Sequence, residues 1–237
     1  MTATWIAPIR PADHAEHSLV EAVLDGTFPP GSELPGERQL AISLGVTRPT
    51  LREALQRLER DGWVTVRQGR RTVVNHFWQE GGLNVLGALV KHSQHLSTDF
   101  VEHLLEIRLY LAPPYMAAAV ACVPDEVAAL LSQHRDLPDR AEAFAAFDWE
   151  VHRRLSIASG NPIFTLILNG FAGFYERLAG IYFALSEARD RSTRFYSDLE
   201  TAARSNDRDA AERVSRQVMQ DSIELWRSAG GATFTVP

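Results

Sequence analysis

The stretch LPGERQLAISLGVTRPTLREALQRLERDGWVTVRQGRRTVVN, residues 34–75, decides the fold of the N-terminal third of the chain. Its first helix is predicted near 35–44, because proline is tolerated in the first helical turn. Gly45 and Val46 follow as a tight turn. The second helix begins after Thr47, a typical N-cap residue, and ends at Gly62, a typical left-handed C-cap residue. We therefore expect two short helices that are joined by a sharp turn.

A β-hairpin is predicted directly after these helices. Residues 63–66 and 72–75 have the alternating pattern of strands, and Gly69 permits the turn between them. A further helix is expected upstream at 11–25, where apolar residues recur at helical spacing before Gly26. Three helices and a hairpin in this order predict a winged helix-turn-helix, which places its last helix in the major groove of DNA.

Charge is distributed unevenly along the chain. The whole chain of 237 residues has a net charge of -6, but residues 34–78 contain eight arginines and four carboxylates, a net of +4. A positive field confined to one segment is typical of a nucleic-acid contact surface. With a single cysteine, Cys122, which we expect to be buried, an intramolecular disulfide is excluded. Neither a signal peptide nor an apolar run long enough to span a bilayer is apparent, so we expect a cytoplasmic protein.

The rest of the chain has helical periodicity throughout. Residues 76–82 are predicted to link the DNA-binding domain, residues 1–75, to an all-α domain over 83–229, and residues 230–237 to form a loose tail. The expected fold class is mainly α: a winged helix with a small hairpin wing, followed by a seven-helix bundle. The predicted helices of the bundle cover residues 83–92, 99–121, 125–135, 139–159, 161–185, 188–205 and 208–229.

The predicted recognition helix carries polar and guanidinium side chains at its N-terminal end, where such a helix enters the major groove. These residues are Thr47, Arg48, Thr50 and Arg52. Arginine is a bidentate reader of guanine, and threonine hydroxyls can contact phosphates or base edges. Arg38 in the preceding helix and the Gln68-Gly69 tip of the wing complete the expected DNA surface. The alternative is a solvated charged face, which the order of helices and wing disfavours.

This segment resembles the DNA-binding domain of the GntR family of bacterial regulators. Within that family, NHFWQEGGLNVL, HLLEIRLYL, ASGNPIFTLILNG and the closing ELW are similar to the fatty-acid metabolism regulators of FadR type. The resemblance covers most of the chain and implies a homodimer that binds a pseudo-palindromic operator. It places Arg38, Thr47, Arg48, Thr50, Arg52, Gln68 and Gly69 at DNA-contacting positions, with Pro49 where relatives have threonine and Gln68 where they have histidine.

The same resemblance implies that the helical domain binds long-chain acyl-CoA and that this ligand releases the DNA. The matching positions are Arg108, Tyr182, Arg216, Ser222 and Trp226, whereas Val218 and Met219 replace a tyrosine and a glycine. A CoA thioester requires cations for its phosphates and an apolar tunnel for its chain. The residues by themselves leave alternatives open: Arg108 could pair with an internal carboxylate, Trp226 could be core, and Ser222 could be an ordinary helix residue.

A different effector class is suggested by Asp148 and His152, which are spaced i, i+4 on a predicted helix. In FCD-type members of the GntR family, an Asp and a His so placed bind a metal with two further histidines, and a small organic acid completes the site. Tyr196 and Val218 occupy the positions that would supply those histidines, and two ligands rarely hold Zn²⁺. We therefore expect no metal or cofactor.

An enzyme is not indicated by any pattern in the chain. We find no nucleophile elbow, P-loop, dinucleotide fingerprint or closed metal motif. The sequence therefore predicts a DNA-binding transcription regulator whose trigger is long-chain acyl-CoA, with a small organic acid as the alternative.

Overall fold

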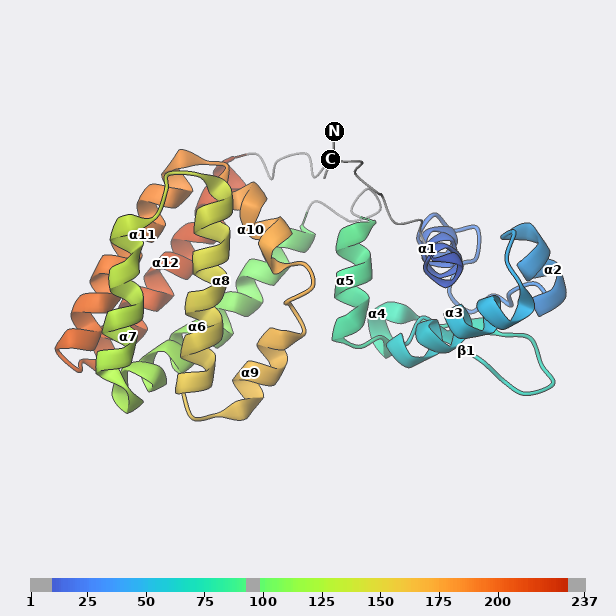
Figure 1. Ribbon diagram of the computed structural model, residues 1–237, viewed down its shortest axis with the longest axis horizontal. Coiled ribbons are helices and arrows are strands. Elements are labelled where there is room, and N and C mark those ends of the chain that lie inside the picture. Colours follow the sequence, from blue (N-terminus) through green and yellow to red (C-terminus); the bar gives the residue numbers. More distant parts are fainter. Residues whose placement is uncertain (1–9, 93–98, 230–237) are drawn as a thin grey trace, which may run out of the picture. The chain divides into compact units, whose positions relative to one another are not determined.

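The computed structural model of the chain describes residues 10–92 and 99–229. It divides into two compact units between residues 95 and 96, called here the N-terminal unit and the C-terminal unit (Figure 1). The tail predicted for residues 230–237 lies outside the described residues. Within them, no single helix is both long and apolar enough to cross a membrane, although the bent pair 100–122 and 124–136 passes that test when combined.

The N-terminal unit contains the predicted winged helix-turn-helix. Helices α1, α2 and α3 pack together through apolar side chains, among which Leu19, Leu51 and Leu58 are buried. Each fully buried leucine contributes about 1.5–3 kcal/mol relative to an exposed one. The elements are α1 (Pro11–Leu24), α2 (Glu37–Ser43), α3 (Arg48–Asp61), β1 (Val64–Thr65), β2 (Val73–Val74), α4 (Phe77–Glu80) and α5 (Leu83–Lys91).

The ends of α3 are set by the residues that the sequence singled out. The Thr47 side chain accepts a hydrogen bond from the Thr50 backbone N–H at 3.3 Å, which confirms Thr47 as the N-cap. Gly62 ends the helix with a φ of +91°, as predicted. A Cβ at Gly62 would lie 2.8 Å from the Cα of Gly81, so glycine is required for close approach as well as for the turn.

The wing is a two-stranded antiparallel hairpin, shorter than predicted. Val64 pairs with Val74 and Thr65 with Val73, and Gly69 adopts a φ of +71° in the connecting turn. Asn75 ties the base of the wing to the end of α3, because its amide donates to the Gly62 carbonyl at 3.2 Å. The base of the hairpin is therefore fixed to the C-terminal end of α3.

The segment predicted as a linker contains a helix of its own. α4 lies within residues 76–82, and its Phe77 ring packs on Trp63 with ring centroids 4.8 Å apart. α5, which we predicted to belong to the helical domain, contacts α3 and falls within the N-terminal unit. The division into compact units therefore comes after α5 instead of before it.

The C-terminal unit is entirely helical in its described part. α6 lies at its centre and packs against both α12 and α8 (Figure 1). Cys122 at the end of α6 is exposed, so the expectation of a buried thiol was wrong. The helices are α6 (Phe100–Cys122), α7 (Pro124–Leu131), a 3₁₀ turn η2 (Ser132–Asp136), α8 (Ala141–Ala158), α9 (Pro162–Asn169), α10 (Tyr175–Phe183), α11 (Ser186–Arg204) and α12 (Arg208–Ser228).

The helix predicted over residues 161–185 is two helices in the structure. α9 ends at Asn169, the chain turns through 170–174, and α10 begins at Tyr175. Gly170 and Gly173 within this turn lower the helical preference of the segment, which the apolar periodicity concealed. The break has a consequence for the site described below, because Phe171 and Phe174 project from this turn.

Candidate functional site

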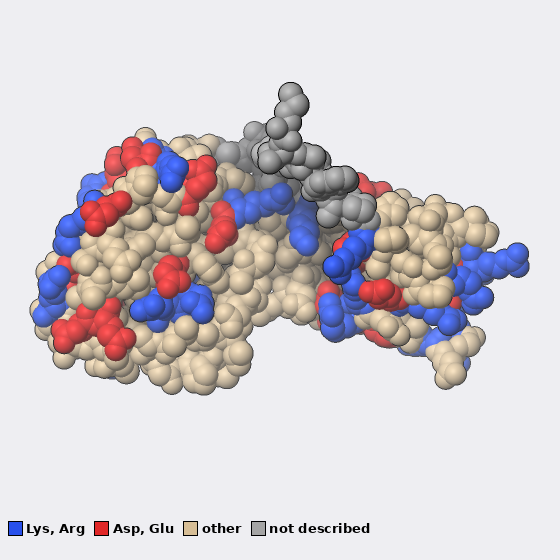
Figure 2. Space-filling model, viewed as in Figure 1, with Lys and Arg blue, Asp and Glu red and all other residues tan. Residues whose placement is uncertain are grey.

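A groove in the N-terminal unit brings the predicted DNA-contacting arginines together. It lies between α2, the start of α3 and the wing, and Figure 2 shows basic side chains gathered at one edge of this unit. Pro49 and Gln68 are exposed nearby but do not line the groove. The lining residues are Gly36, Glu37, Arg38, Gln39, Ile42, Arg48, Arg52, Gly69 and Arg70.

The groove also contains a carboxylate that the sequence did not indicate. Glu37, the first residue of α2, accepts a hydrogen bond from the Arg52 Nε at 2.8 Å, and its Oε2 lies 3.7 Å from the Arg48 Nη2. Arg48 and Arg52 are spaced i, i+4 on α3, where like charges repel. Glu37 therefore offsets that repulsion and holds one arginine by its Nε.

The two threonines of the recognition helix are already hydrogen bonded to each other. The hydroxyl oxygens of Thr47 and Thr50 are 2.8 Å apart, and Thr47 also caps the helix. Both hydroxyls remain at the N-terminal end of α3, next to Arg48. A helix N-terminus favours phosphate through its free N–H groups.

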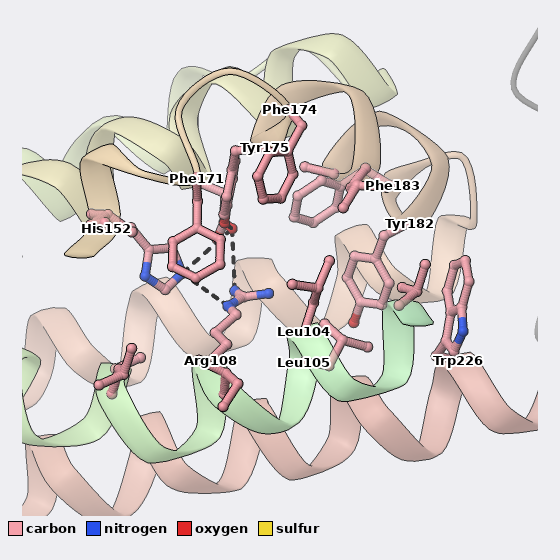
Figure 3. A pocket seen from close by; sticks show the side chains of 18 of the residues that line it. Leu104, Leu105, Arg108, His152, Phe171, Phe174, Tyr175, Tyr182, Phe183 and Trp226 are labelled. Carbon is pink, nitrogen blue, oxygen red and sulfur yellow. Dashed lines mark hydrogen bonds and ion pairs between the residues drawn. The ribbon is translucent and has the colours of Figure 1, made fainter. Parts of the chain in front are cut away.

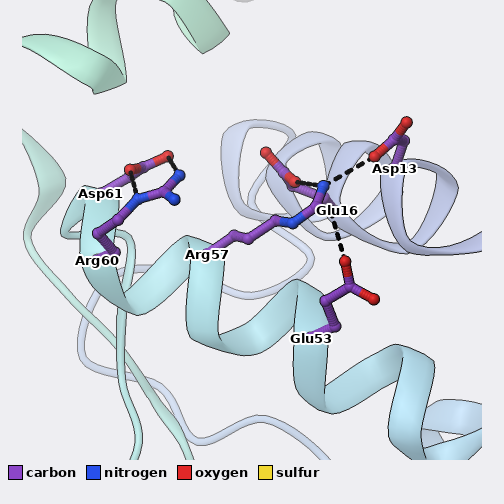
Figure 4. A network of polar contacts seen from close by, with 6 residues as sticks. All are labelled: Asp13, Glu16, Glu53, Arg57, Arg60 and Asp61. Atoms are coloured by element: carbon purple, nitrogen blue, oxygen red, sulfur yellow. Dashed lines mark hydrogen bonds and ion pairs between the residues drawn. The ribbon is translucent and has the colours of Figure 1, made fainter.

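Not all of the basic residues of this segment face the groove. Arg57 on α3 contacts Asp13 and Glu16 of α1 as well as Glu53, and it fastens the two helices together (Figure 4). These carboxylates raise the pKa of Arg57, the bond to Asp13 being the strongest cause. Arg60 is similarly paired, with Asp61 at 2.9 Å. Arg57 therefore joins α1 to α3, and neither Arg57 nor Arg60 lines the groove.

The C-terminal unit contains an apolar cavity between α6, α8, α9, α10 and α12 (Figure 3). The volume of this cavity that a water-sized sphere can occupy is about 100 Å³, so the cavity is narrow. Ile107 lines the cavity and is also 46% exposed to solvent. The lining residues are Val101, Leu104, Leu105, Ile107, Arg108, Leu111, Ala112, Tyr115, Asp148, His152, Phe164, Leu168, Phe171, Phe174, Tyr175, Leu178, Ala179, Tyr182, Phe183 and Trp226.

A cluster of polar groups is buried in this apolar wall around Arg108. The Arg108 guanidinium donates from Nε to His152 Nε2 at 3.1 Å and from Nη2 to Asp148 Oδ2 at 3.2 Å. Tyr175 also donates to Asp148 Oδ2, and Tyr196 donates to Asp148 Oδ1 at 2.8 Å. The internal carboxylate that we considered as a partner for Arg108 is therefore Asp148.

The pKa values in the cluster follow from burial and from the Arg108 charge. Burial, and to a smaller extent the neighbouring Arg108 guanidinium, lower the pKa of His152 to about 3, so the imidazole is neutral. Burial by itself would raise the pKa of Asp148, but the Arg108 charge, together with the hydrogen bonds from Tyr175 and Tyr196, more than offsets this and the pKa is lowered. The cluster therefore holds one cation, one anion and a neutral histidine.

Two of the other predicted effector residues, Tyr182 and Trp226, line another part of the cavity, and a third, Ser222, is hydrogen bonded to Tyr182. Tyr182 donates to the Ser222 hydroxyl at 3.2 Å, and Ser222 donates to the Val218 carbonyl at 2.7 Å. Trp226 is buried on the cavity wall, and its Nε1 has no hydrogen-bond partner among residues 10–92 and 99–229. Trp226 is therefore both a core residue and part of the cavity wall.

Arg216 is the predicted effector residue that the structure does not bring to the cavity. It is exposed on α12 and pairs with Glu212 at 2.9 Å. Spacing along a helix placed it broadly with Ser222 and Trp226, but one helical face extends beyond the cavity. Met219, which replaces the glycine of the relatives, is buried and does not line the cavity.

The arrangement of Asp148 and His152 disfavours the metal site that we considered as an alternative. The Asp148 Oδ2 and His152 Nε2 atoms both accept hydrogen bonds from the Arg108 guanidinium. Within the described residues no group of three or more His, Cys, Asp or Glu could hold a metal ion. The Arg108 side chain therefore uses the atoms of Asp148 and His152 that a metal would need as ligands.

Several cavity residues were not identified from the sequence. Tyr115 comes from α6, whereas Phe171 and Tyr175 come from the turn between α9 and α10 and the start of α10, and their positions read as apolar positions of continuous helices. A buried tyrosine hydroxyl requires a hydrogen-bond partner, and this was the available signal in the chain. It does not show which partner is used, because that depends on packing.

Comparison with known proteins extends this description to the whole chain. Residues 11–74 match the model of bacterial regulatory proteins of the gntR family, and residues 75–232 match the FadR C-terminal domain. A fatty acid metabolism regulator protein of Klebsiella pneumoniae is 41% identical over 216 residues, 91% of this chain and 90% of that protein. One of Yersinia pestis is 40% identical over 221 residues, 93% of this chain and 92% of that protein.

Among solved structures, Listeria monocytogenes Lar is similar in fold, with a TM-score of 0.61 and 15% identity over 95% of this chain and 99% of that one. The predicted winged helix followed by a helical domain is confirmed by these matches and by the structure. The chain therefore belongs to the GntR family of DNA-binding transcription regulators, in the group that carries the FadR C-terminal domain.

Proposed function

We propose that this protein regulates the transcription of fatty-acid metabolism genes and that a long-chain acyl-CoA releases it from its operator. The observation that supports the trigger most directly is the cavity of the C-terminal unit, whose walls are apolar except for the Arg108 cluster and a few groups near Trp226. A long alkyl chain is the ligand class that such walls favour. The fatty acid metabolism regulators to which the chain is similar point in the same direction.

The polar part of an acyl-CoA would remain outside the apolar cavity. Trp226 is the residue that α12 contributes to the cavity wall, and Arg216 is exposed farther back on the same helix. A CoA phosphate requires a cation, and an exposed guanidinium supplies one with bidentate geometry. We therefore retain Arg216 as a proposed contact for the nucleotide part of the ligand and not for the acyl chain.

The DNA-bound form is proposed to be a homodimer on a pseudo-palindromic operator. A helix-turn-helix of this size reads one half-site, and two-fold symmetry of the protein is matched by symmetry in the DNA. The acyl-CoA can release DNA only if it binds the DNA-free conformation more tightly than the DNA-bound one. The recognition helices would then be displaced from their half-sites when the cavity is filled.

The test is a titration of the full-length chain, bound to its genomic upstream DNA, with palmitoyl-CoA. We expect release of the DNA and a rise in the melting temperature of the free protein, since a ligand stabilises the state that it binds. Acetyl-CoA and free CoA, which lack the alkyl chain, are matched controls and should do neither. Unchanged operator affinity and unchanged melting temperature with palmitoyl-CoA would exclude acyl-CoA as the trigger.

A further inference from the structure

The hydrogen bonds of His152 determine where its proton lies. An arginine Nε always carries a proton, so the contact between Arg108 Nε and His152 Nε2 at 3.1 Å requires a lone pair on Nε2. A neutral imidazole with a lone pair on Nε2 has its proton on Nδ1. That Nδ1 is hydrogen bonded to the Tyr115 hydroxyl. His152 is therefore the donor in this bond, and the Tyr115 oxygen is the acceptor.

This assignment leaves the hydroxyl proton of Tyr115 without an acceptor. Tyr115 is only 3% exposed, and the bond to His152 is the one that its hydroxyl makes within residues 10–92 and 99–229. A buried donor that stays unpaired destabilises the folded chain. Both Tyr115 and His152 line the cavity, so an acceptor for this proton can be supplied by a molecule that fills the cavity.

The unpaired donor lies in the part of the cavity that is remote from Trp226. In Figure 3, His152 and Trp226 are at opposite ends of the labelled side chains, with Arg108 and Tyr182 between them. An acyl chain whose thioester lies near Trp226 and Ser222 would extend toward His152 and Tyr115. The far end of the chain would then meet a polar wall, which a plain methyl terminus does not satisfy.

We propose that the acyl ligand of this protein carries an uncharged oxygen group, a hydroxyl or a ketone, at the part of its chain that reaches Tyr115. The group is uncharged because the Arg108 cation is already paired with Asp148 at 3.2 Å, and a further buried charge would have no partner. Tyr115 donates to that oxygen and selects oxygenated chains over plain ones. This inference rests on the proposed acyl-CoA response and specifies its ligand class.

The test compares plain and ω-hydroxylated acyl-CoA thioesters of three chain lengths, myristoyl, palmitoyl and stearoyl, so that the hydroxyl is offered at three depths. Binding to the full-length chain is measured by calorimetry, and DNA release is measured in parallel. We expect the wild-type chain to bind one hydroxylated thioester about fivefold more tightly than its plain counterpart, the value of one hydrogen bond. Equal binding of each pair at all three lengths would overturn the proposal.

The variant Tyr115→Phe removes the donor, so it should bind the hydroxylated and the plain thioester about equally. The ratio between two ligands is the readout, because a general effect on packing would change both affinities together. Tyr110→Phe is the matched control on the same helix, since Tyr110 is 71% exposed and does not line the cavity. Its ratio should equal that of the wild type.

A preference that persists in Tyr115→Phe would overturn the role assigned to this hydroxyl. If that variant does not fold, the comparison in the wild-type chain still decides whether oxygenated chains are preferred. Binding of plain palmitoyl-CoA without any preference would refute this inference and leave the proposed function intact. If no thioester binds, the proposed function fails together with it.

Discussion

The Arg52 Nε donates to a carboxylate oxygen of Glu37 at 2.8 Å, which places a negative charge inside the arginine groove of the winged helix. The pair joins the first residue of α2 to the N-terminal end of α3, which is predicted to enter the major groove. DNA phosphates repel this carboxylate and attract the arginine, so the pair opposes indiscriminate binding to the backbone. The bond leaves both Nη groups of Arg52 available for a bidentate contact with guanine.

Glu37→Gln should strengthen binding to DNA of unrelated sequence by about twofold to fivefold at low salt. The expected size follows from exposed ion pairs, which are worth about 0.2–1 kcal/mol. Fluorescence anisotropy with a scrambled duplex over a range of salt concentrations measures the change. Glu21→Gln removes the same charge from an exposed position of α1 and should have a smaller effect. An equal gain in both variants would assign the effect to net charge alone.

Arg52→Ala should weaken operator binding and reduce discrimination at one base pair by about 1–3 kcal/mol. The arginine is exposed in the groove and is positioned by Glu37. Binding to a set of single-base operator variants gives the discrimination at each position. Arg60→Ala is the control on the same helix, because Arg60 pairs with Asp61 away from the groove. Undiminished discrimination in Arg52→Ala would remove this residue from base recognition.

Stability should decrease as the pH falls below about 6.5, the pKa of an unperturbed histidine. Burial lowers the pKa of His152 to about 3 in the folded chain, so between these values only the unfolded chain binds this proton. The free energy of unfolding then falls by up to about 1.4 kcal/mol per pH unit. Urea unfolding at pH values about one unit apart, from about pH 7 to 4, measures this free energy of unfolding.

The variant His152→Gln separates this contribution from that of the other titrating groups. A glutamine amide does not titrate, and its oxygen can accept from Arg108. The free energy of unfolding should therefore fall less steeply with decreasing pH in the variant than in the wild type. The difference between the two slopes should correspond to up to about one proton between about pH 6 and 4. An identical slope in the variant and the wild type would show that His152 is protonated in both states.

Trp226→Phe should weaken the binding of the acyl-CoA ligand about fivefold, which corresponds to one hydrogen bond of about 1 kcal/mol. The buried Trp226 Nε1 lines the cavity without a partner in the described part of the chain, so it is available to an oxygen of the ligand. Calorimetric titration with palmitoyl-CoA measures the change. Trp78→Phe in the N-terminal unit is the control, and equal affinities of all three proteins would exclude a hydrogen bond from Trp226.

Much of the DNA-binding unit could be predicted from residues 34–75. Its helix ends depend on local chemistry, such as the Thr47 cap and the left-handed Gly62, and such chemistry is written in a few adjacent residues. The helical domain was predicted in outline because apolar periodicity identifies amphipathic helices. The break between α9 and α10 was missed, since apolar side chains recur on both sides of Gly170.

The effector cavity could be predicted only in part. Resemblance to FadR-type regulators indicated Arg108, Tyr182, Ser222 and Trp226, and the structure brings all four to the cavity or to its hydrogen bonds. It leaves Arg216 on the surface of α12, where it pairs with Glu212. Helical spacing gives the direction of a side chain but not how far along the helix a cavity extends.

The sequence by itself determined the order of the helices, their caps, the wing and the placement of positive charge, because these depend on residues close together in the chain. Only the tertiary structure decided which arginines face the groove, since Arg57 is paired with carboxylates of α1 whereas Arg48 and Arg52 meet Glu37 of α2. It also decided that Arg108, Asp148 and His152 meet in one buried cluster. Contacts between residues far apart in the chain are set by packing, which no local pattern records.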